Sequence, residues 1–225
     1  LGGQDEKVGI AGWLFIVGSI ALAGGLQFLR VGFIQWRSVL LFGLPGMLGT
    51  YLGAMLSAYV SGVMQLALFA VVMLIASALM LRPIDLQRTE VSARAAWKIA
   101  VDGLVVGVIT GLVGVGGGFL IVPALVLLGG LTMHQAVATS LIIIALKSFS
   151  GFWKYLEVLE AQSLELDWAT LLIVTALGIA GSVAGSKLAR KLPQQKLKRG
   201  FGWFLIVMGI YILARSGPAA LGISS

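Results

Sequence analysis

Long apolar segments, separated by short polar ones, run along the whole chain. The apolar runs fall at residues 8–29, 38–60, 62–81, 99–130, 135–156, 168–187 and 200–214. A helix needs about 20 apolar residues to cross the hydrocarbon core of a bilayer. Most of the runs fit one crossing each, so the pattern predicts an all-α integral membrane protein that crosses the bilayer several times.

The run at 99–130 does not fit a single crossing. It is too long for one ordinary helix, and it is interrupted by Gly114, Gly116, Gly117 and Gly118. Its halves, about 101–115 and 119–130, are each short for a full crossing. The pattern therefore predicts either one long broken helix or a re-entrant hairpin.

Composition supports a membrane protein and excludes several other classes. The chain is 59% hydrophobic and 11% charged, whereas a soluble domain is nearer half apolar and a quarter charged. In a membrane protein, a net charge of +7 indicates basic cytoplasmic segments beside the lipid bilayer rather than a nucleic-acid partner. The sequence has no cysteine, no metal-ligand cluster, no Walker loop and no nucleophile–base pairing. It therefore predicts neither an enzyme nor an ATP-driven pump, and no metal or other cofactor.

The chain also repeats itself. At an offset of 127 residues, Gly24 meets Gly151 and Phe28 meets Tyr155. A short insertion near 158–165 shifts the offset to 132, where "QW" at 35–36 meets "DW" at 167–168. At that second offset three glycines recur, because Gly46, Gly49 and Gly53 meet Gly178, Gly181 and Gly185. Residues 1–82 and 128–215 are thus predicted to be two copies of one unit, an arrangement common in secondary transporters.

This repeat predicts the domain organisation. The first repeat spans 1–82, a basic cytoplasmic loop spans 83–98, and a tail spans 216–225. The second repeat spans 99–215, because the glycine-dense segment precedes its copy of the unit. The first repeat lacks such a segment, so we expect the natural protein, or an ancestor, to have carried a matching segment before Leu1.

The distribution of basic residues favours the re-entrant hairpin. If the run at 99–130 crosses once, the basic residues of the loops divide seven against eight. If it returns to its starting face, twelve basic residues, at 30–37, 82–98 and 187–199, share one side, and Lys7, Lys154 and Arg215 lie on the other. Cytoplasmic loops carry an excess of Lys and Arg. The prediction is therefore two inverted repeats, each of a broken or re-entrant segment plus three transmembrane helices, with the first broken segment missing from this chain.

Lys147 is the only charged residue deep inside a predicted span, half-way along 135–156. An ionised side chain there costs several kcal/mol unless it faces protein or water, which indicates a functional role; the alternatives are snorkelling or pairing with a backbone carbonyl. Its helix also carries hydroxyl side chains that would suit the oxygens of an anion: Thr139, Ser140, Ser148 and Ser150. Ser140, Lys147 and Ser150 fall near one helix face. Simple helix packing is an equally good explanation for each hydroxyl residue taken singly.

Gly116, Gly117 and Gly118 open the second half of the broken run. A glycine-rich helix start places unpaired backbone N–H groups, here those of Gly116–Phe119, where they can bind an anion. The alternative is a kink or close helix packing.

Gly49 and Gly53, with Gly181 and Gly185, have small-xxx-small spacings that predict close helix contacts. Trp36 and Trp168 are predicted interfacial residues, and the segments Arg82–Lys98 and Lys187–Arg199 are predicted cytoplasmic basic loops.

Residues 110–144, "TGLVGVGGGFLIVPALVLLGGLTMHQAVATSLIII", resemble the hallmark of the TauE/SafE family of membrane permeases. The matching pattern is G-x-G-G-G, then Val122-Pro123, a later glycine, and A-x-x-T-S-L at 136–141. Residues 36–82 look like the second half of the family's first repeat. The resemblance implies a multi-pass protein of the bacterial inner membrane, carrying sulfite or an organosulfonate by a proton or other gradient. The first-repeat glycine motif is absent: "AGWL" at 11–14 stands where the second copy has "ATSL".

The leading hypothesis is a secondary transporter for such an anion, working by alternating access. Lys147 would attract the anion, the N–H groups of Gly116–Phe119 would hold its oxygens, and Ser140, Ser148 and Ser150 would donate hydrogen bonds. The alternatives are a small-anion channel with the same fold and a non-transporting membrane scaffold. Asp102, near a span end, is the one candidate proton carrier. The sequence indicates neither the direction of transport nor an oligomeric state.

Overall fold

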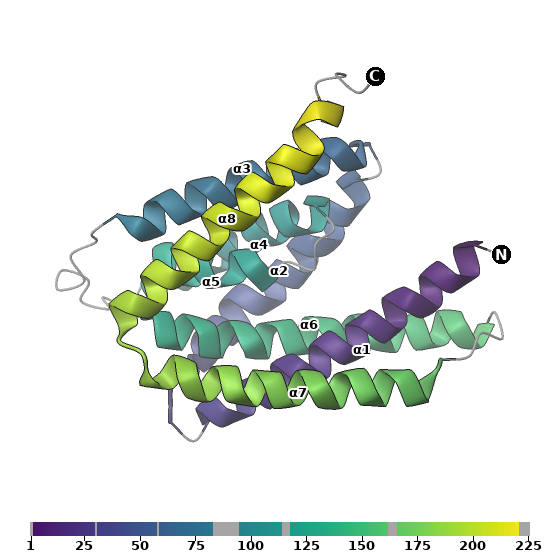
Figure 1. Ribbon diagram of the computed structural model, residues 1–225, viewed down its shortest axis with the longest axis horizontal. Helices are drawn as coiled ribbons and strands as arrows, with labels where there is room; N and C mark the ends of the chain where they lie inside the picture. Colours follow the sequence, from purple (N-terminus) through teal and green to yellow (C-terminus); the bar gives the residue numbers. More distant parts are fainter. Residues whose placement is uncertain are drawn as a thin grey trace. The chain divides into compact units, whose positions relative to one another are not determined.

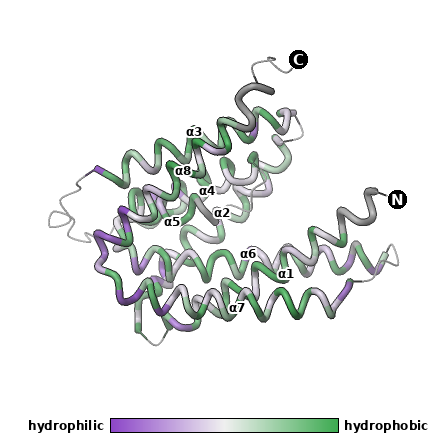
Figure 2. The backbone as a smooth tube through the Cα atoms, in the orientation of Figure 1, coloured by the Kyte–Doolittle hydropathy of each residue, from purple (hydrophilic) through white to green (hydrophobic). Residues whose placement is uncertain are grey.

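The computed structural model describes residues 2–29, 31–57, 59–82, 95–113, 118–161 and 166–220, and all regular secondary structure in these ranges is α-helical. The helices in these ranges are α1 (Gly2–Leu29), α2 (Trp36–Ser57), α3 (Gly62–Leu81), α4 (Ala96–Val113), α5 (Gly118–Leu127), α6 (Met133–Ala161), α7 (Trp168–Lys191) and α8 (Gln194–Ala220). Seven of these helices, all except α5, are long and apolar enough to cross a membrane. Figure 2 shows hydrophobic residues along the helices and a hydrophilic junction between α7 and α8. The prediction of an all-α membrane protein is confirmed.

The long apolar run 99–130 forms two helices rather than one. At 1.5 Å per residue, α4 is about 27 Å long and α5 only about 15 Å, so α5 is too short to cross a bilayer. The break predicted at the glycines falls on residues 114–117, which lie outside the described residues.

Polar side chains determine where three helices begin. Ahead of α6, Thr132 and Gln135 form a reciprocal capping box, in which each side chain accepts a hydrogen bond from the other residue's backbone N–H. Ser61 accepts from the N–H of Met64 at the start of α3, and Asp167 accepts from the N–H of Thr170 at the start of α7. These caps satisfy backbone donors that have no partner inside a helix.

The chain divides into two compact units. The first unit comprises Leu1–Ile34 and Ala138–Lys191, and the second comprises Gln35–Val137 and Leu192–Ser225. The first unit therefore holds α1, all of α7 and most of α6. The second unit holds α2, α3, α4, α5, α8 and the beginning of α6. Each unit takes helices from both halves of the sequence.

In the first unit, α1 packs against both α6 and α7 (Figure 1). Leu14 meets Gly151, and Gly25 meets Ile142, so α1 and α6 run antiparallel. Along α7 the order is the same as along α1: Gly12 meets Leu171, and the hydroxyl of Ser182 donates to the carbonyl oxygen of Ile20 at 3.2 Å. The helices α1 and α7 are therefore parallel.

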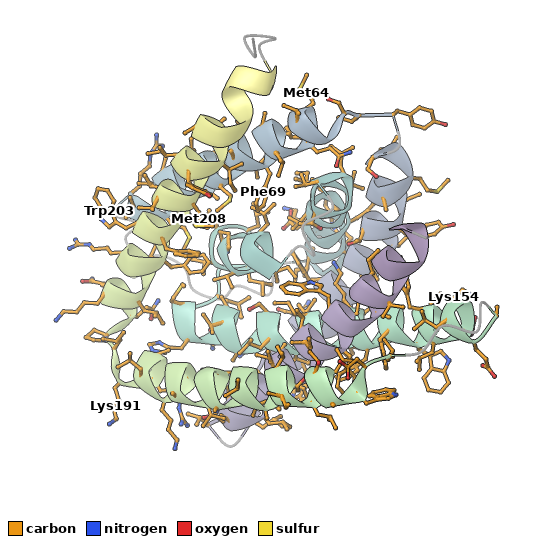
Figure 3. The ribbon with its side chains drawn as sticks, turned by 45° about the vertical axis from the view of Figure 1, so that its right-hand side comes forward. Met64, Phe69, Lys154, Lys191, Trp203 and Met208 are labelled. Carbon is orange, nitrogen blue, oxygen red and sulfur yellow. The ribbon has the colours of Figure 1, made fainter. Side chains whose placement is uncertain are left out.

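In the second unit, α2 packs on α4 and α3 packs on α8. The α2·α4 contact is parallel and runs through glycines on both helices, which are Gly46, Gly49 and Gly53 on α2 and Gly103, Gly107 and Gly111 on α4. The α3·α8 contact is antiparallel: the buried hydroxyl of Ser77 donates to the carbonyl oxygen of Gly202 at 2.7 Å, and Gly209 lies against Leu74 and Ala70. The exposed indole of Trp203 points away from this pair (Figure 3).

Two sequence predictions about this architecture are wrong. Gly181 and Gly185 make no close helix contact, because a Cβ at either position would meet no atom of the described residues within 4 Å. The segment Lys187–Arg199 is not a loop: α7 continues to Lys191 and α8 begins at Gln194, so its basic residues lie on helix ends. Basic side chains in the last turn of α7 also interact favourably with the negative end of the helix dipole. Most of the basic loop expected at 83–98 lies outside the described residues.

Candidate functional site

Lys147 lies at the centre of α6, fourteen residues from Met133 and fourteen from Ala161. At 1.5 Å per residue it is about 21 Å from either helix end and about 9 Å along the axis from Trp153, so it lies inside the apolar part of the helix. Its side chain is partly buried. A cation in this position is costly in lipid, so it must face protein or water.

The hydroxyl residues predicted to accompany Lys147 divide into three kinds. Thr139 and Ser140 are almost fully buried, with exposures of 0% and 1%. Ser148 is also buried, and it faces α1, where its Cβ lies 3.1 Å from the position that a Cβ on Gly18 would occupy. Ser150 is exposed. Thr139, Ser140 and Ser148 are therefore buried on the helix that carries Lys147, with Ser148 against α1, and their joint role in anion binding stays a prediction.

The predicted glycine cradle is described only in part. Gly116 and Gly117 lie outside the described residues, and Gly118 and Phe119 begin α5 in the second unit. Pro123 is the sixth residue of α5, where it has no N–H to donate to the carbonyl oxygen of Phe119. The contribution of backbone N–H groups of Gly116–Phe119 to anion binding stays a prediction.

A row of polar residues on α7, which the sequence reasoning missed, faces α1 in the first unit. It consists of Ser182, Ser186 and Arg190 at four-residue spacing. The hydroxyls of Ser182 and Ser186 both lie beside Gly24. The guanidinium of Arg190 donates to the carbonyl oxygen of Gln27 at 3.5 Å and lies 5.9 Å from the ring centre of Phe28. The regular spacing was the available signal, but only Arg190 was assigned from the sequence, to a predicted basic loop, and the two serines were assigned no role.

Two polar side-chain atoms of the first unit are buried without a hydrogen-bond partner among the described residues. They are the side-chain oxygen of Gln27 and the hydroxyl oxygen of Thr175. Buried polar groups are usually paired, and leaving one unpaired costs about 1–3 kcal/mol. The interior of the first unit therefore contains polar atoms whose hydrogen-bonding capacity is not used by the described residues.

The described residues contain no group of three or more His, Cys, Asp or Glu side chains that could hold a metal ion. His134 lies in the first turn of α6.

Comparison with known proteins agrees with this architecture. The family model described as "Sulfite exporter TauE/SafE" matches residues 7–212. A probable membrane transporter protein of Xylella fastidiosa (strain 9a5c) is 31% identical over 192 residues, which are 82% of this chain and 71% of the relative. YunE, a probable membrane transporter protein of Bacillus subtilis, is 28% identical over 230 residues, covering 92% of this chain and 81% of the relative. A probable membrane transporter protein of Methanocaldococcus jannaschii is 22% identical, covering 92% of this chain and 79% of the relative. No solved structure matches the chain.

Seven candidate membrane-spanning helices, together with the match to a family of membrane transporters, identify a multi-pass protein of the probable membrane transporter class rather than an enzyme. The chain belongs to the sulfite exporter TauE/SafE family.

Proposed function

We propose that this protein is a secondary transporter that carries sulfite or an organosulfonate anion across the bacterial inner membrane by alternating access. The observation that carries the proposal is Lys147 at the centre of a membrane-spanning helix, on the same helix as the buried hydroxyls of Thr139 and Ser140. A fixed cation with hydroxyl donors is suited to a small oxyanion. The description of the matching family, a sulfite exporter, supports a sulfur oxyanion in particular.

Helix directions support a re-entrant α4–α5 segment. If α1 crosses from one face of the membrane to the other, α2 returns and α3 crosses again, so α3 ends on the face where α1 ended. Because α6 is antiparallel to α1, it begins on that same face. The segment between α3 and α6 must therefore leave from and return to one face. The antiparallel α3·α8 pair in the second unit gives the same result independently.

The helix boundaries support the inverted repeat. Both α2 and α7 begin at a tryptophan, Trp36 and Trp168, and 168 − 36 = 132. Both α3 and α8 begin at the same offset, because Gly62 and Gln194 give 194 − 62 = 132. With α4–α5 re-entrant, the three helices of the first repeat cross in directions opposite to those of the second. Inverted repeats of this kind place substrate near the midplane and provide alternating access by rocking.

In this proposal Lys147 is the electrostatic partner of the substrate, and the α6 hydroxyls donate hydrogen bonds to the oxyanion. Ser140 and Thr139 supply donors on α6, and Ser148 supplies one at the contact with α1. Backbone N–H groups of Gly116–Phe119 are a further predicted source of donors. The negative charge of a bound substrate offsets the free-energy cost of burying the charged lysine. The loaded transporter is therefore more stable than the empty one.

Proton coupling is assigned to Asp102 on α4. Glu157 and Glu160 lie within the last two turns of α6, whereas Asp102 is the seventh residue of the candidate span Ala96–Val113, about 9 Å from its start. Among the carboxylates inside candidate spans of the described residues, it lies farthest from its nearer helix end, about 9 Å against about 6 Å for Glu157. An acid in this position can exchange a proton between the membrane interior and one aqueous face. Asp102→Asn is expected to abolish uptake driven by a pH gradient while leaving exchange of labelled for unlabelled anion intact.

Uptake of radiolabelled sulfite and of a sulfonate into proteoliposomes tests the assignment of Lys147. Lys147→Ala is expected to lower the initial rate by about tenfold or more, because a hydrogen bond to a charged group contributes about 1.5–3 kcal/mol. Lys147→Arg should retain part of the activity by keeping the charge. Lys154→Ala is the matched control, since Lys154 lies on the same helix but is 74% exposed and pairs with Glu157. Unchanged transport by Lys147→Ala would remove Lys147 from the mechanism.

Counterflow separates a carrier from a channel with the same fold. A carrier loaded with unlabelled anion on the far side accelerates entry of labelled anion, and a channel does not. Absence of both flux and ligand-dependent thermal stabilisation would indicate a membrane scaffold instead.

A further inference from the structure

A groove of about 270 Å³ lies between α1 and the beginning of α7, within the first unit. Its walls are mostly apolar and include Val8, Gly12 and Ile16 from α1 and Leu171 from α7. One carboxylate, that of Asp167, and the indole of Trp13 line the same groove. The groove follows α1 from Val8 to Ile16, which is about 12 Å of helix at 1.5 Å per residue.

Three exposed tryptophans place the groove at the level of the lipid headgroups. Trp13, Trp153 and Trp168 are 64%, 72% and 48% exposed. They lie at one end of the first unit, because Leu14 meets Gly151, and the ring of Phe15 is 5.8 Å from that of Trp168. Exposed tryptophans concentrate where the hydrocarbon core meets water. Lys154 lies at this end and Lys191 at the other end of the unit (Figure 3).

Asp167 gives the groove a permanent negative charge. It accepts hydrogen bonds from the N–H and the hydroxyl of Thr170. These bonds lower the pKa of its carboxyl group below the usual value of 3.8, so it is ionised at neutral pH. Each carboxylate oxygen retains a lone pair for a further donor. The neighbouring acid Glu157 differs, because it is already paired with Lys154 at 2.6 Å.

We propose that this groove binds a phospholipid with a primary ammonium headgroup, of the phosphatidylethanolamine type. The ammonium group donates to the Asp167 carboxylate beside Trp13, and one acyl chain lies along Val8, Gly12 and Ile16. An anionic headgroup is repelled by Asp167. A quaternary ammonium has no N–H to donate, so phosphatidylcholine binds more weakly. The site is independent of the transport mechanism and holds whatever anion the protein carries.

Native mass spectrometry of the whole chain in detergent, with equimolar phosphatidylethanolamine, phosphatidylcholine and phosphatidylglycerol, tests this site. The wild-type protein should retain phosphatidylethanolamine about threefold better than the other two lipids, the size expected of an exposed ion pair. Asp167→Asn should remove that preference. Asparagine is as good a helix cap as aspartate, so α7 stays intact, and thermal unfolding checks this. Equal retention of the three lipids by the wild type, or an unchanged preference in Asp167→Asn, would overturn the proposal.

A second variant tests the position of the acyl chain. A side chain at Gly9, which also lines the groove, would meet no atom within 4 Å, so Gly9→Leu fills the groove without strain. It is expected to reduce retention of all three lipids. Gly185→Leu is the matched control, because Gly185 is equally open but lies away from the groove on α7. Equal lipid retention in the two variants would exclude the groove as the binding site. Equally tight binding of soluble phosphoethanolamine would show that the occupant is not a lipid.

Discussion

The helices α2 and α7, which the sequence repeat pairs, carry glycines at matching positions and use them differently. On α2, Gly49 and Gly53 lie so close to α4 that a Cβ at either would overlap the backbone of Leu104 or Val108. On α7, the matching Gly181 and Gly185 are exposed and meet no described atom. The small-xxx-small spacing is the same in both helices, so spacing alone does not produce a contact.

The difference lies in the partner helix. Opposite α2, the helix α4 offers Gly103, Gly107 and Gly111 at four-residue spacing, and each of these would also place a Cβ into the backbone of α2. Because both helices lack side chains along the contact, their backbones approach directly, and van der Waals packing holds them together. Opposite α7, the helix α1 presents Ile20 to Gly178, and the two helices are joined by hydrogen bonds instead.

The largest expected difference in stability is between alanine substitutions at Gly53 and at Gly185. Gly53→Ala should destabilise the protein by about 3 kcal/mol, because the new Cβ overlaps the backbone of α4, which cannot move aside as a side chain can. Gly185→Ala should change the free energy of unfolding by less than about 0.5 kcal/mol. Unfolding of each variant in mixed micelles with increasing SDS measures the difference. Similar losses for the two variants would mean that the exposed face of α7 is covered in the membrane.

A smaller effect is expected at Gly178, the counterpart of Gly46. A Cβ on Gly178 would overlap the end of the Ile20 side chain, which can rotate away. Gly178→Ala should therefore cost about 1 kcal/mol. Combining it with Ile20→Val, which shortens the opposing side chain, should recover most of the loss in the same unfolding assay. A loss as large as that of Gly53→Ala, with no recovery, would mean that α1 and α7 are as closely packed as α2 and α4.

Most of the helical fold could be predicted from apolar runs and their interruptions. The run 62–81 coincides with α3, and the tryptophans at 36 and 168 begin α2 and α7. Helix ends that carry charged residues were harder to predict. The apolar run ends where charged residues begin, but the helix can continue through them. Thus α6 continues through Lys154 and Glu157, which pair on its surface, and α8 begins before Lys196.

For the candidate site, which stays a prediction, the sequence could point to a residue only where that residue is unusual in itself. Lys147 is identified by its charge in an apolar span, and this needs no partner to be recognised. Ser182 and Arg190 donate hydrogen bonds to backbone oxygens of α1, which lies more than 150 residues earlier in the chain. The sequence around Ser182 and Arg190 does not indicate that α1 is their partner. For the same reason the sequence could not distinguish Gly49, which has a partner in α4, from Gly181, which has none among the described residues.

Thr50 and Ser182 occupy matching positions and extend the comparison to hydrogen bonds. The hydroxyl of Thr50 donates to the carbonyl oxygen of Gly46 in its own helix, whereas that of Ser182 donates across to α1. Ser182→Ala should cost about 0.6 kcal/mol, the typical value for a hydrogen bond between membrane helices. Thr50→Val, which keeps the shape, should cost less. A larger loss in Thr50→Val would indicate that α2·α4 also depends on side-chain hydrogen bonds.

The smallest effect concerns the residues just ahead of the two helices, Gln35 before α2 and Asp167 before α7. Asp167 has a depressed pKa in the folded state, because Thr170 donates two hydrogen bonds to its carboxylate. Its contribution to stability is therefore fully present above its unfolded value of 3.8 and is lost as the pH falls through the lower folded value. Gln35 does not titrate. Acidification from pH 5 to about 3 should thus speed amide exchange in the first turn of α7 but not of α2, after correction for intrinsic rates. Asp167→Asn should abolish the pH dependence while keeping the cap; equal acid sensitivity of both helix starts would show that the Asp167 cap does not distinguish them.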